Sequence, residues 1–168
     1  MRLSTSILTL LLSSLVGAKF FSQDPLVDTL GDSIPGDSPI KLCEGAEEDN
    51  ILKIDHVNLT PNPPQAGNNL TIEASGTLSK DVEEGAYVNL QVKYGNYIKL
   101  VDTKADLCDQ IQNVDLECPL KKGDNKVTKD VSLPKQIPPG KYHVFADVYT
   151  KDDEKITCLT AEVSFPRS

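Results

Sequence analysis

The sequence is poor in the residues that usually fill a protein core or bind a nucleic acid. It has no tryptophan, one methionine, 5 tyrosines and 4 phenylalanines in 168 residues, so a core must be built mainly from valine, isoleucine and leucine. Positive charge is also scarce, because 17 Lys and Arg stand against 25 Asp and Glu, which gives a net charge of -8. This acidic balance disfavours nucleic acid as a partner. The length suits one domain, and an apolar content of 39% is enough to bury a core.

The sequence also lacks the motifs of common enzymes and metal sites. It contains no Gly-x-Ser-x-Gly elbow, no Gly-rich phosphate loop and no His-Glu-x-x-His helix. Zinc is disfavoured because there is no Cys-x-x-Cys pair and the two histidines, His56 and His143, are far apart. The cluster Asp152-Asp153-Glu154 fits a solvated hairpin turn better than a calcium site. We therefore expect no enzymatic activity, no cofactor and no metal.

Residues 1–18 have the features of a signal peptide. Arg2 precedes an apolar stretch from Ile7 to Val16, and the following Gly17 and Ala18 are small residues of the kind that signal peptidase accepts. The apolar stretch is about ten residues long, whereas a transmembrane helix needs about 20, so a membrane anchor is the weaker alternative. We expect a protein of the secretory pathway, located in a vacuolar or lysosomal lumen or outside the cell.

Two N-glycosylation sequons fit the same route. They begin at Asn58 and Asn69, and Asn69 is the better acceptor because Pro61 directly follows the first sequon.

Four cysteines indicate disulfides, because an even number in an exported chain is first interpreted in this way. They are Cys43, Cys108, Cys118 and Cys158, and three connectivities are possible. The short polar spacing between Cys108 and Cys118 favours a local bridge, which leaves Cys43 and Cys158 to tie the ends of the domain together. In the chain-entropy model the local bridge contributes a little under about 3 kcal/mol and the long one nearer to about 5 kcal/mol.

The rest of the chain divides into an arm and a β-rich domain. Residues 19–42 are rich in Pro, Gly and Asp without an apolar period, which predicts a flexible or pro-segment-like arm. From residue 50 on, short stretches alternate apolar and polar residues between turn signals. We expect strands over residues 52–56, 70–78, 86–94, 98–100, 127–133, 142–149 and 158–165. Seven such strands with almost no helical period predict an all-β sandwich of two antiparallel sheets.

The inward positions of these strands are mostly small or medium-sized, which leaves two interpretations. The ordinary one is that the sheets touch over a valine-rich core. The other is a dry apolar cavity between the sheets, which would hold an apolar ligand because its walls offer water no polar partners. The register of the last strand also directs Cys158 away from the apolar face, which the pattern alone does not explain.

Dispersed motifs in this chain resemble those of one family. They are Leu42-Cys43-Glu44, the stretch from Ile54 to Pro64 followed by Gly67 and Leu70-Thr71-Ile72, Gly85-Ala86-Tyr87-Val88, Val92-Lys93-Tyr94-Gly95, Leu107-Cys108, Cys118-Pro119-Leu120, Leu133-Pro134, Ile137-Pro138-Pro139-Gly140 and Tyr149 to Leu159. Together they resemble the fungal phosphatidylglycerol/phosphatidylinositol transfer proteins, in the Niemann-Pick type C2-like branch of the ML lipid-recognition domain. The resemblance runs from about Leu42 to Phe165, so residues 43–168 are expected to form the lipid-binding domain.

The resemblance implies an immunoglobulin-like sandwich whose sheets separate to admit a sterol or a phospholipid tail. It places the mouth near Cys118-Pro119-Leu120 and implies the bridges Cys43–Cys158 and Cys108–Cys118. A pro-segment, frequent in the family, would suit residues 19–42. The animal members have a third disulfide at an early corner, where this chain has only Pro61 to Pro64 and no cysteine, so the shape of that corner is not fixed by the resemblance.

These expectations combine into a function and a set of site residues. We expect a monomeric carrier of sterol or phospholipid that docks transiently on a membrane or a membrane protein. The alternative is an immunoglobulin-like module that recognises a protein and binds no lipid, although true immunoglobulin domains contain a core tryptophan that this chain lacks. The side chains expected to line the cavity are Leu70, Ile72, Ala74, Val88, Leu90, Val92, Tyr94, Ile98, Pro119, Leu120, Val144, Ala146, Val148, Ala161 and Val163.

Overall fold

The structure is a computed structural model that describes residues 31–45 and 50–166, so the expected signal peptide and residues 19–30 of the expected arm lie outside the described residues. Within the described part there are eight strands, one short α-helix and one 3-10 turn. They are β1 (Ile40–Leu42), β2 (Leu52–Thr60), β3 (Asn69–Leu78), β4 (Tyr87–Tyr94), β5 (Ile98–Asp106), α1 (Leu107–Ile111), η1 (Gln112–Val114), β6 (Gly123–Ser132), β7 (Gly140–Tyr149) and β8 (Lys155–Phe165). None of the described helices is long and apolar enough to cross a membrane.

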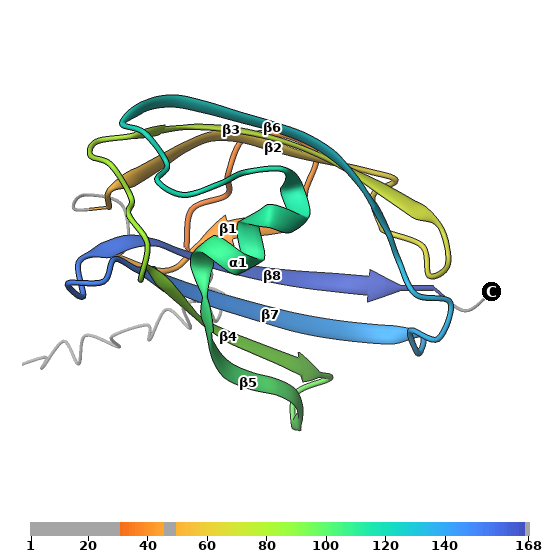
Figure 1. Ribbon diagram of the computed structural model, residues 1–168. Coiled ribbons are helices and arrows are strands. Elements are labelled where there is room, and N and C mark those ends of the chain that lie inside the picture. The colour runs from red at the N-terminus through yellow and green to blue at the C-terminus, as the bar shows by residue number, and fades with distance from the viewer. Residues whose placement is uncertain (1–30, 46–49, 167–168) are drawn as a thin grey trace, which may run out of the picture.

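The strands form two antiparallel sheets that face each other (Figure 1), which confirms the predicted sandwich. One sheet has the order β1-β8-β7-β4-β5 and the other the order β2-β3-β6. The alternation on β3 and the hairpin between β4 and β5 follow the expected pattern. Gly95 lies in that hairpin turn with φ 57°, a conformation that glycine adopts without strain. The sequence pattern missed β1 and α1, and it started β6 four residues late.

One side of the sandwich is sealed by residues 32–42, which we call the strap. Backbone hydrogen bonds attach it to the smaller sheet, because Val57 N donates to Pro35 O (2.9 Å) and Leu59 N donates to Asp37 O (2.9 Å). Its last residues form β1 and pair with β8 of the larger sheet. The Ile34 side chain is buried with 4% exposure. We expected a flexible arm over residues 19–42, but residues 32–42 pack against both sheets instead.

Gly36 makes the close approach of the strap to β2 possible. It has φ +116°, and a Cβ at this position would lie 2.3 Å from Val57 O. Any other residue would therefore clash with the β2 backbone and adopt a strained conformation.

The two disulfides have the connectivity that the resemblance implied. Cys43 is bonded to Cys158 and Cys108 to Cys118, with Cα–Cα distances of 5.3 and 5.6 Å. Cys158 does lie on the outer face of β8, opposite to its neighbour Leu159, yet it is only 2% exposed. The chain that continues from the strap contributes to this burial, because Cys43 runs beside β8, donates its N–H to Cys158 O (3.0 Å) and is bonded to the Cys158 side chain.

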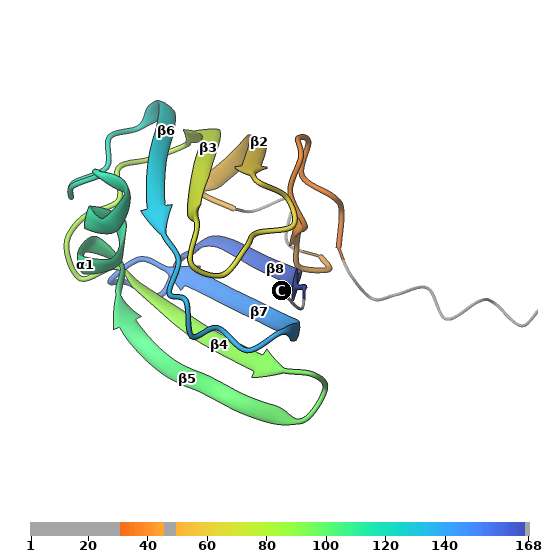
Figure 2. The same cartoon turned by 90° about the vertical axis from the view of Figure 1, so that its right-hand side faces the viewer.

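The opposite side of the sandwich carries a covering segment, residues 107–120, which we call the mouth loop. It includes α1 and η1 and connects the edge strands β5 and β6 (Figure 2). Asp106 caps α1 by accepting a hydrogen bond from Asp109 N (3.1 Å). At its end the loop is anchored by a two-way backbone bridge between Leu120 and Val82 (2.9 Å in each direction).

The buried core is divided into two clusters. The first surrounds Val82 and the second surrounds Val57 and the strap residue Ile34. A small domain more often has one contiguous core. Open space between the two clusters is therefore compatible with a well-packed remainder of the domain.

Candidate functional site

An apolar cavity of about 320 Å³ lies between the two sheets. Its lining is composed of aliphatic side chains with three small polar residues among them. The lining residues are Ile40, Leu52, Ile54, Val57, Ile72, Ala74, Ser75, Gly76, Leu78, Val82, Leu107, Ile111, Leu116, Leu120, Asn125, Val127, Val148, Ile156, Thr157 and Leu159. None of these side chains is ionisable, so the interior stays uncharged at any ordinary pH.

Three parts of the fold build the cavity wall. Strands β2, β3 and β6 contribute one layer, and β7 and β8 contribute the facing layer. The mouth loop closes the side between β5 and β6, where Ile111 and Leu116 reach into the cavity. The strap contributes Ile40 on the opposite side. Space remains at the centre because β3 places the small residues Ala74 and Gly76 there, between larger side chains on the neighbouring strands.

One polar atom in the wall lacks a partner. Thr157 lines the cavity on β8, and its Oγ1 is buried without a hydrogen-bond partner among the described residues. Burying an unpaired hydroxyl is unfavourable. A ligand that carries a donor or acceptor to this point of the wall would satisfy it.

Four of the fifteen side chains predicted to line a cavity do so: Ile72, Ala74, Leu120 and Val148. The other eleven lie elsewhere, although most of them share the correct face of their strands. They are Leu70, Val88, Leu90, Val92, Tyr94, Ile98, Pro119, Val144, Ala146, Ala161 and Val163. Leu70 and Val88 belong to the two buried clusters that flank the cavity.

The far end of the larger sheet is filled by aromatic side chains, which explains several of these differences. Tyr94 and Tyr142 pack edge to face at 5.2 Å between ring centroids, and Tyr142 packs in the same way on Phe165 at 5.4 Å. Val92 and Val144 are paired two residues nearer the centre of the sheet. Both are half-buried, and neither is among the residues that line the cavity. Ile98, at the start of β5, is 56% exposed.

Sequence reasoning placed Leu120 in the wall but missed the contribution of β2 and of the earlier part of the mouth loop. Leu52 and Ile54 were recognised as one face of a strand, but they were not assigned to the cavity. The mouth loop contributes Leu107 and Ile111, which are four residues apart on one side of α1. That helical spacing was a signal in the sequence, although the helix has only five residues and is therefore easily overlooked.

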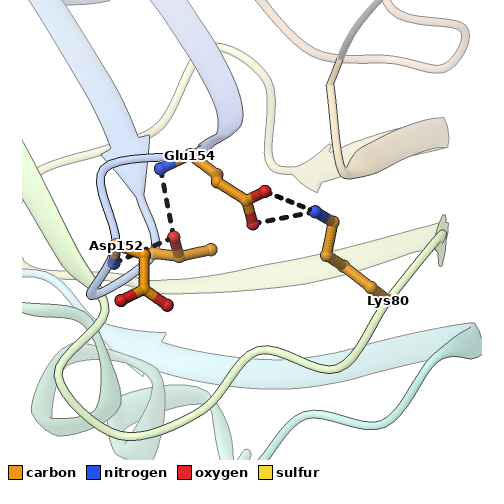
Figure 3. A network of polar contacts seen from close by, with 4 residues as sticks. Lys80, Asp152 and Glu154 are labelled. Atoms are coloured by element: carbon orange, nitrogen blue, oxygen red, sulfur yellow. Dashed lines mark hydrogen bonds and ion pairs between the residues drawn. The ribbon is translucent and has the colours of Figure 1, made fainter.

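The acidic cluster after β7 closes a hairpin turn (Figure 3). Thr150 Oγ1 accepts hydrogen bonds from the backbone N–H groups of Asp152 (3.3 Å) and Glu154 (3.1 Å). The Lys80 amine donates to both carboxylate oxygens of Glu154 at 2.8 Å. Over residues 31–45 and 50–166, no group of three or more His, Cys, Asp or Glu side chains is arranged to hold a metal ion.

The two histidines make polar contacts with neighbouring strands. His143 Nδ1 lies 3.8 Å from Glu162, which also pairs with Lys141 (2.6 Å). The Lys141 ammonium holds the pKa of the Glu162 carboxyl below its usual value. His56 Nδ1 and Ser75 Oγ are hydrogen-bonded at 2.8 Å. These groups form ordinary surface and strand-to-strand contacts.

The sequence matches one protein family and is similar to several of its members. A family model described as ML domain matches residues 37–165. The chain is 56% identical over 170 residues to the phosphatidylglycerol/phosphatidylinositol transfer protein of Pyricularia oryzae, which covers 100% of this chain and 95% of that one. It is 53% identical over 169 residues to the protein of the same name from Neurospora crassa, with 99% and 95% of the two chains covered. Among solved structures, a Niemann-Pick type C2 protein from Japanese carpenter ant matches with a TM-score of 0.47 and 16% identity over 71% of this chain and 96% of that chain.

Proposed function

Because the chain belongs to the ML domain family, we propose that it takes a glycerophospholipid into the cavity between its sheets and carries it between membranes. The observation that carries this proposal is the apolar cavity, which both sheets and the mouth loop line without an ionisable group. A protein-recognition module without a lipid ligand would have no use for such a space. Sterol is the second ligand class, because aliphatic walls do not distinguish one hydrocarbon from another.

The volume of the cavity sets how much of a lipid it can hold. Small-molecule sites span roughly 300 to 1,000 Å³, so a cavity of about 320 Å³ suits one hydrocarbon tail better than a whole phospholipid. Burying roughly 300 Å² of hydrocarbon gains on the order of 7 kcal/mol at about 25 cal/mol per Å², before the costs of association are subtracted. A Kd of 1 μM requires about 8 kcal/mol, so burial of one tail alone gives weaker binding, and contacts of the rest of the lipid must add to it.

The route through the cell follows from the sequence and from the disulfides. The protein is made with a signal peptide over residues 1–18 and works in the secretory or vacuolar lumen or outside the cell. Asn69 is the preferred glycosylation site, because it is exposed, whereas Asn58 is half-buried beside the strap, where its Oδ1 accepts a hydrogen bond from Asp37 N (2.8 Å); the Asn69 Oδ1 accepts one from Ser132 Oγ (2.8 Å). Any pro-segment ends before the strap, since residues 32–42 are hydrogen-bonded to β2 and pair with β8.

The carrier acts as a monomer without enzymatic activity and docks only transiently. The net charge of -8 opposes firm attachment to an anionic bilayer near neutral pH. Partial protonation of carboxylates in an acidic lumen would weaken this repulsion. Transfer to anionic vesicles should then become faster as the pH is lowered from about 7 to 5.

Lipid extraction and transfer together test the proposal. Lipids that co-purify with the protein are identified by mass spectrometry, and the delipidated protein is assayed for transfer of a fluorescent phosphatidylglycerol between vesicles. We expect bound glycerophospholipid and transfer above the spontaneous rate. If no lipid co-purifies and neither phospholipid nor sterol moves faster than in buffer, the cavity has another use.

A further inference from the structure

Lys129 occupies an unusual position at the edge of the cavity. It lies on β6, where residues alternate between half-buried and exposed, and it shares the half-buried face with the lining residue Val127. Its side chain is 31% exposed, the lowest value among the ion-paired lysines of the described residues, which range up to 72% for Lys121. A lysine stem can lie along apolar surface while its amine remains at the edge of the surface. Lys129 is itself not a lining residue, but its strand partner Ile72 on β3 is, so the half-buried side chain lies just outside the lining, at a place that we call the rim.

The partner of Lys129 comes from the mouth loop. The Lys129 amine lies 2.6 Å from Asp115 Oδ2. Asp115 follows η1 with φ 58°, and the next residue, Leu116, lines the cavity. The ion pair thus connects β6 to the mouth loop next to the lining residues Val127 and Leu116.

The two members of the ion pair differ in their exposure to solvent. Asp115 is 71% exposed, so its carboxylate can turn into water with little loss, whereas Lys129 is more enclosed by the protein. An exposed ion pair of this kind contributes only about 0 to 1 kcal/mol to stability. A second anion that is itself anchored at the rim can therefore replace Asp115 on the Lys129 amine.

A glycerophospholipid brings such an anion to the rim. When one of its hydrocarbon tails fills the apolar cavity, its phosphate must stay outside, because the wall offers no charge to pair with it. We propose that Lys129 is the head-group site of this protein and binds the lipid phosphate in place of Asp115. This inference rests on the proposed function and narrows its ligand class from hydrocarbon in general to lipids with a phosphate at the glycerol. A free phosphate ion shares the chemistry but lacks the tail that would hold it at the rim.

The test compares two lipids that differ only in the head group. Transfer between neutral vesicles is measured for phosphatidylglycerol and for diacylglycerol with the same fluorescent acyl chain, in the presence and absence of 10 mM inorganic phosphate. The variants are Lys129→Gln, Asp115→Asn and, as matched control, Lys126→Gln. Lys126 has the same charge and lies on the same strand, but on its exposed face. Asparagine tolerates the positive φ at position 115, so this variant changes the charge without straining the loop.

Lys129→Gln should slow phosphatidylglycerol transfer about tenfold, the value of one charge-assisted hydrogen bond, and leave diacylglycerol transfer unchanged. Asp115→Asn should accelerate phosphatidylglycerol transfer two- to threefold, because the competing carboxylate is gone. Lys126→Gln and inorganic phosphate should change the transfer rate of neither lipid.

Equal effects of Lys129→Gln on both lipids, or slower phosphatidylglycerol transfer in Asp115→Asn, would reduce the pair to a structural contact and overturn the inference. Competition by inorganic phosphate at this concentration would assign the site to the free ion instead. Absence of transfer for both lipids with the unaltered protein would refute the proposed function itself, which keeps the two failures distinct.

Discussion

Replacement of Ala74 by phenylalanine should stabilise the lipid-free protein and at the same time block lipid uptake. Ala74 lies at the centre of β3 and is paired with Val57 on β2 and Val127 on β6, both of which line the cavity. A larger side chain at this position enters the open space directly. Higher stability together with weaker lipid binding is the result expected of a substitution that fills an empty binding cavity.

The structure provides the magnitude of both effects. A phenyl ring takes up roughly 100 Å³ more than a methyl group, and at about 24 cal/mol per Å³ of cavity the free energy of unfolding should rise by about 2 kcal/mol. For a domain of this size that corresponds to an increase in Tm of about 8 °C. The same ring occupies about a third of the 320 Å³ cavity. If a third of the 7 kcal/mol of tail burial is lost, affinity falls by about 2 kcal/mol, or about thirtyfold.

Chemical denaturation of the delipidated variant measures the first effect, and vesicle-to-vesicle transfer measures the second. Val144→Phe is the matched control, because Val144 shares the inner face of β7 but does not line the cavity. Because Val144 is half-buried and outside the lining, the control should change the stability little and retain lipid transfer. An Ala74→Phe protein that is destabilised by about 1 to 3 kcal/mol and still carries lipid would show that the space is closed in solution and that lipid binds elsewhere.

Three further outcomes follow from other parts of the fold. Removal of residues 1–30 should leave Tm unchanged. Removal of residues 1–42 should lower stability by at least about 4 kcal/mol in thermal unfolding, because one buried isoleucine and two backbone hydrogen bonds to β2 are lost together with the pairing of β1 and β8. Thr157→Val should raise the free energy of unfolding of the lipid-free protein by about 1 kcal/mol, since it removes a buried hydroxyl that has no partner among the described residues; a decrease in denaturant titration would show that the hydroxyl is satisfied. The Lys141 ammonium depresses the pKa of Glu162 in the folded state below its usual 4.5, so this contribution to stability is present above pH 4.5 and lost as the pH falls through the lowered value. Tm should therefore be flat from about pH 7 to 5 and fall below about 4.5, with a smaller fall in Glu162→Gln.

The fold was predictable where the signal is local. The period of two on β3 directs Ile72 and Ala74 to one face whatever the rest of the chain does, and the Gly95-Asn96 turn defines the β4–β5 hairpin. The strap was not predictable in the same way. Ile34 stands between turn residues, and the bonds that hold the strap go to the backbone of Val57 and Leu59, more than twenty residues away.

The extent of the cavity was also beyond local reasoning. Strand alternation identifies the inner face, but it does not say where along that face the sheets diverge. In this protein the packing of Tyr94, Tyr142 and Phe165 fills one end of the larger sheet, and the mouth loop extends the lining at the other side. Both depend on which strands are neighbours, which is why Val92 and Val144 were assigned to the wall and Leu116 was not.

The two sides of the sandwich are held by interactions of unequal strength. The strap side combines backbone hydrogen bonds to β2, pairing with β8, a buried Ile34 and the Cys43–Cys158 disulfide. On the other side, the Cys108–Cys118 bridge closes the mouth loop upon itself, and the link from its middle to β6 is the exposed ion pair described above.

Local opening requires breaking the contacts of the segment that moves, so the weaker side should open first. Displacing the middle of the mouth loop costs an ion pair and the contacts of a few half-buried leucine and isoleucine side chains, whereas lifting the strap would expose the edges of both sheets. Opening at the middle of the mouth loop would leave the second buried cluster and the β2–β3–β6 sheet intact, whereas Leu107 and Leu120, at the ends of the loop, pack against the first cluster. A carrier built in this way can release its cargo repeatedly without unfolding, because the energy of folding is concentrated away from the side that opens.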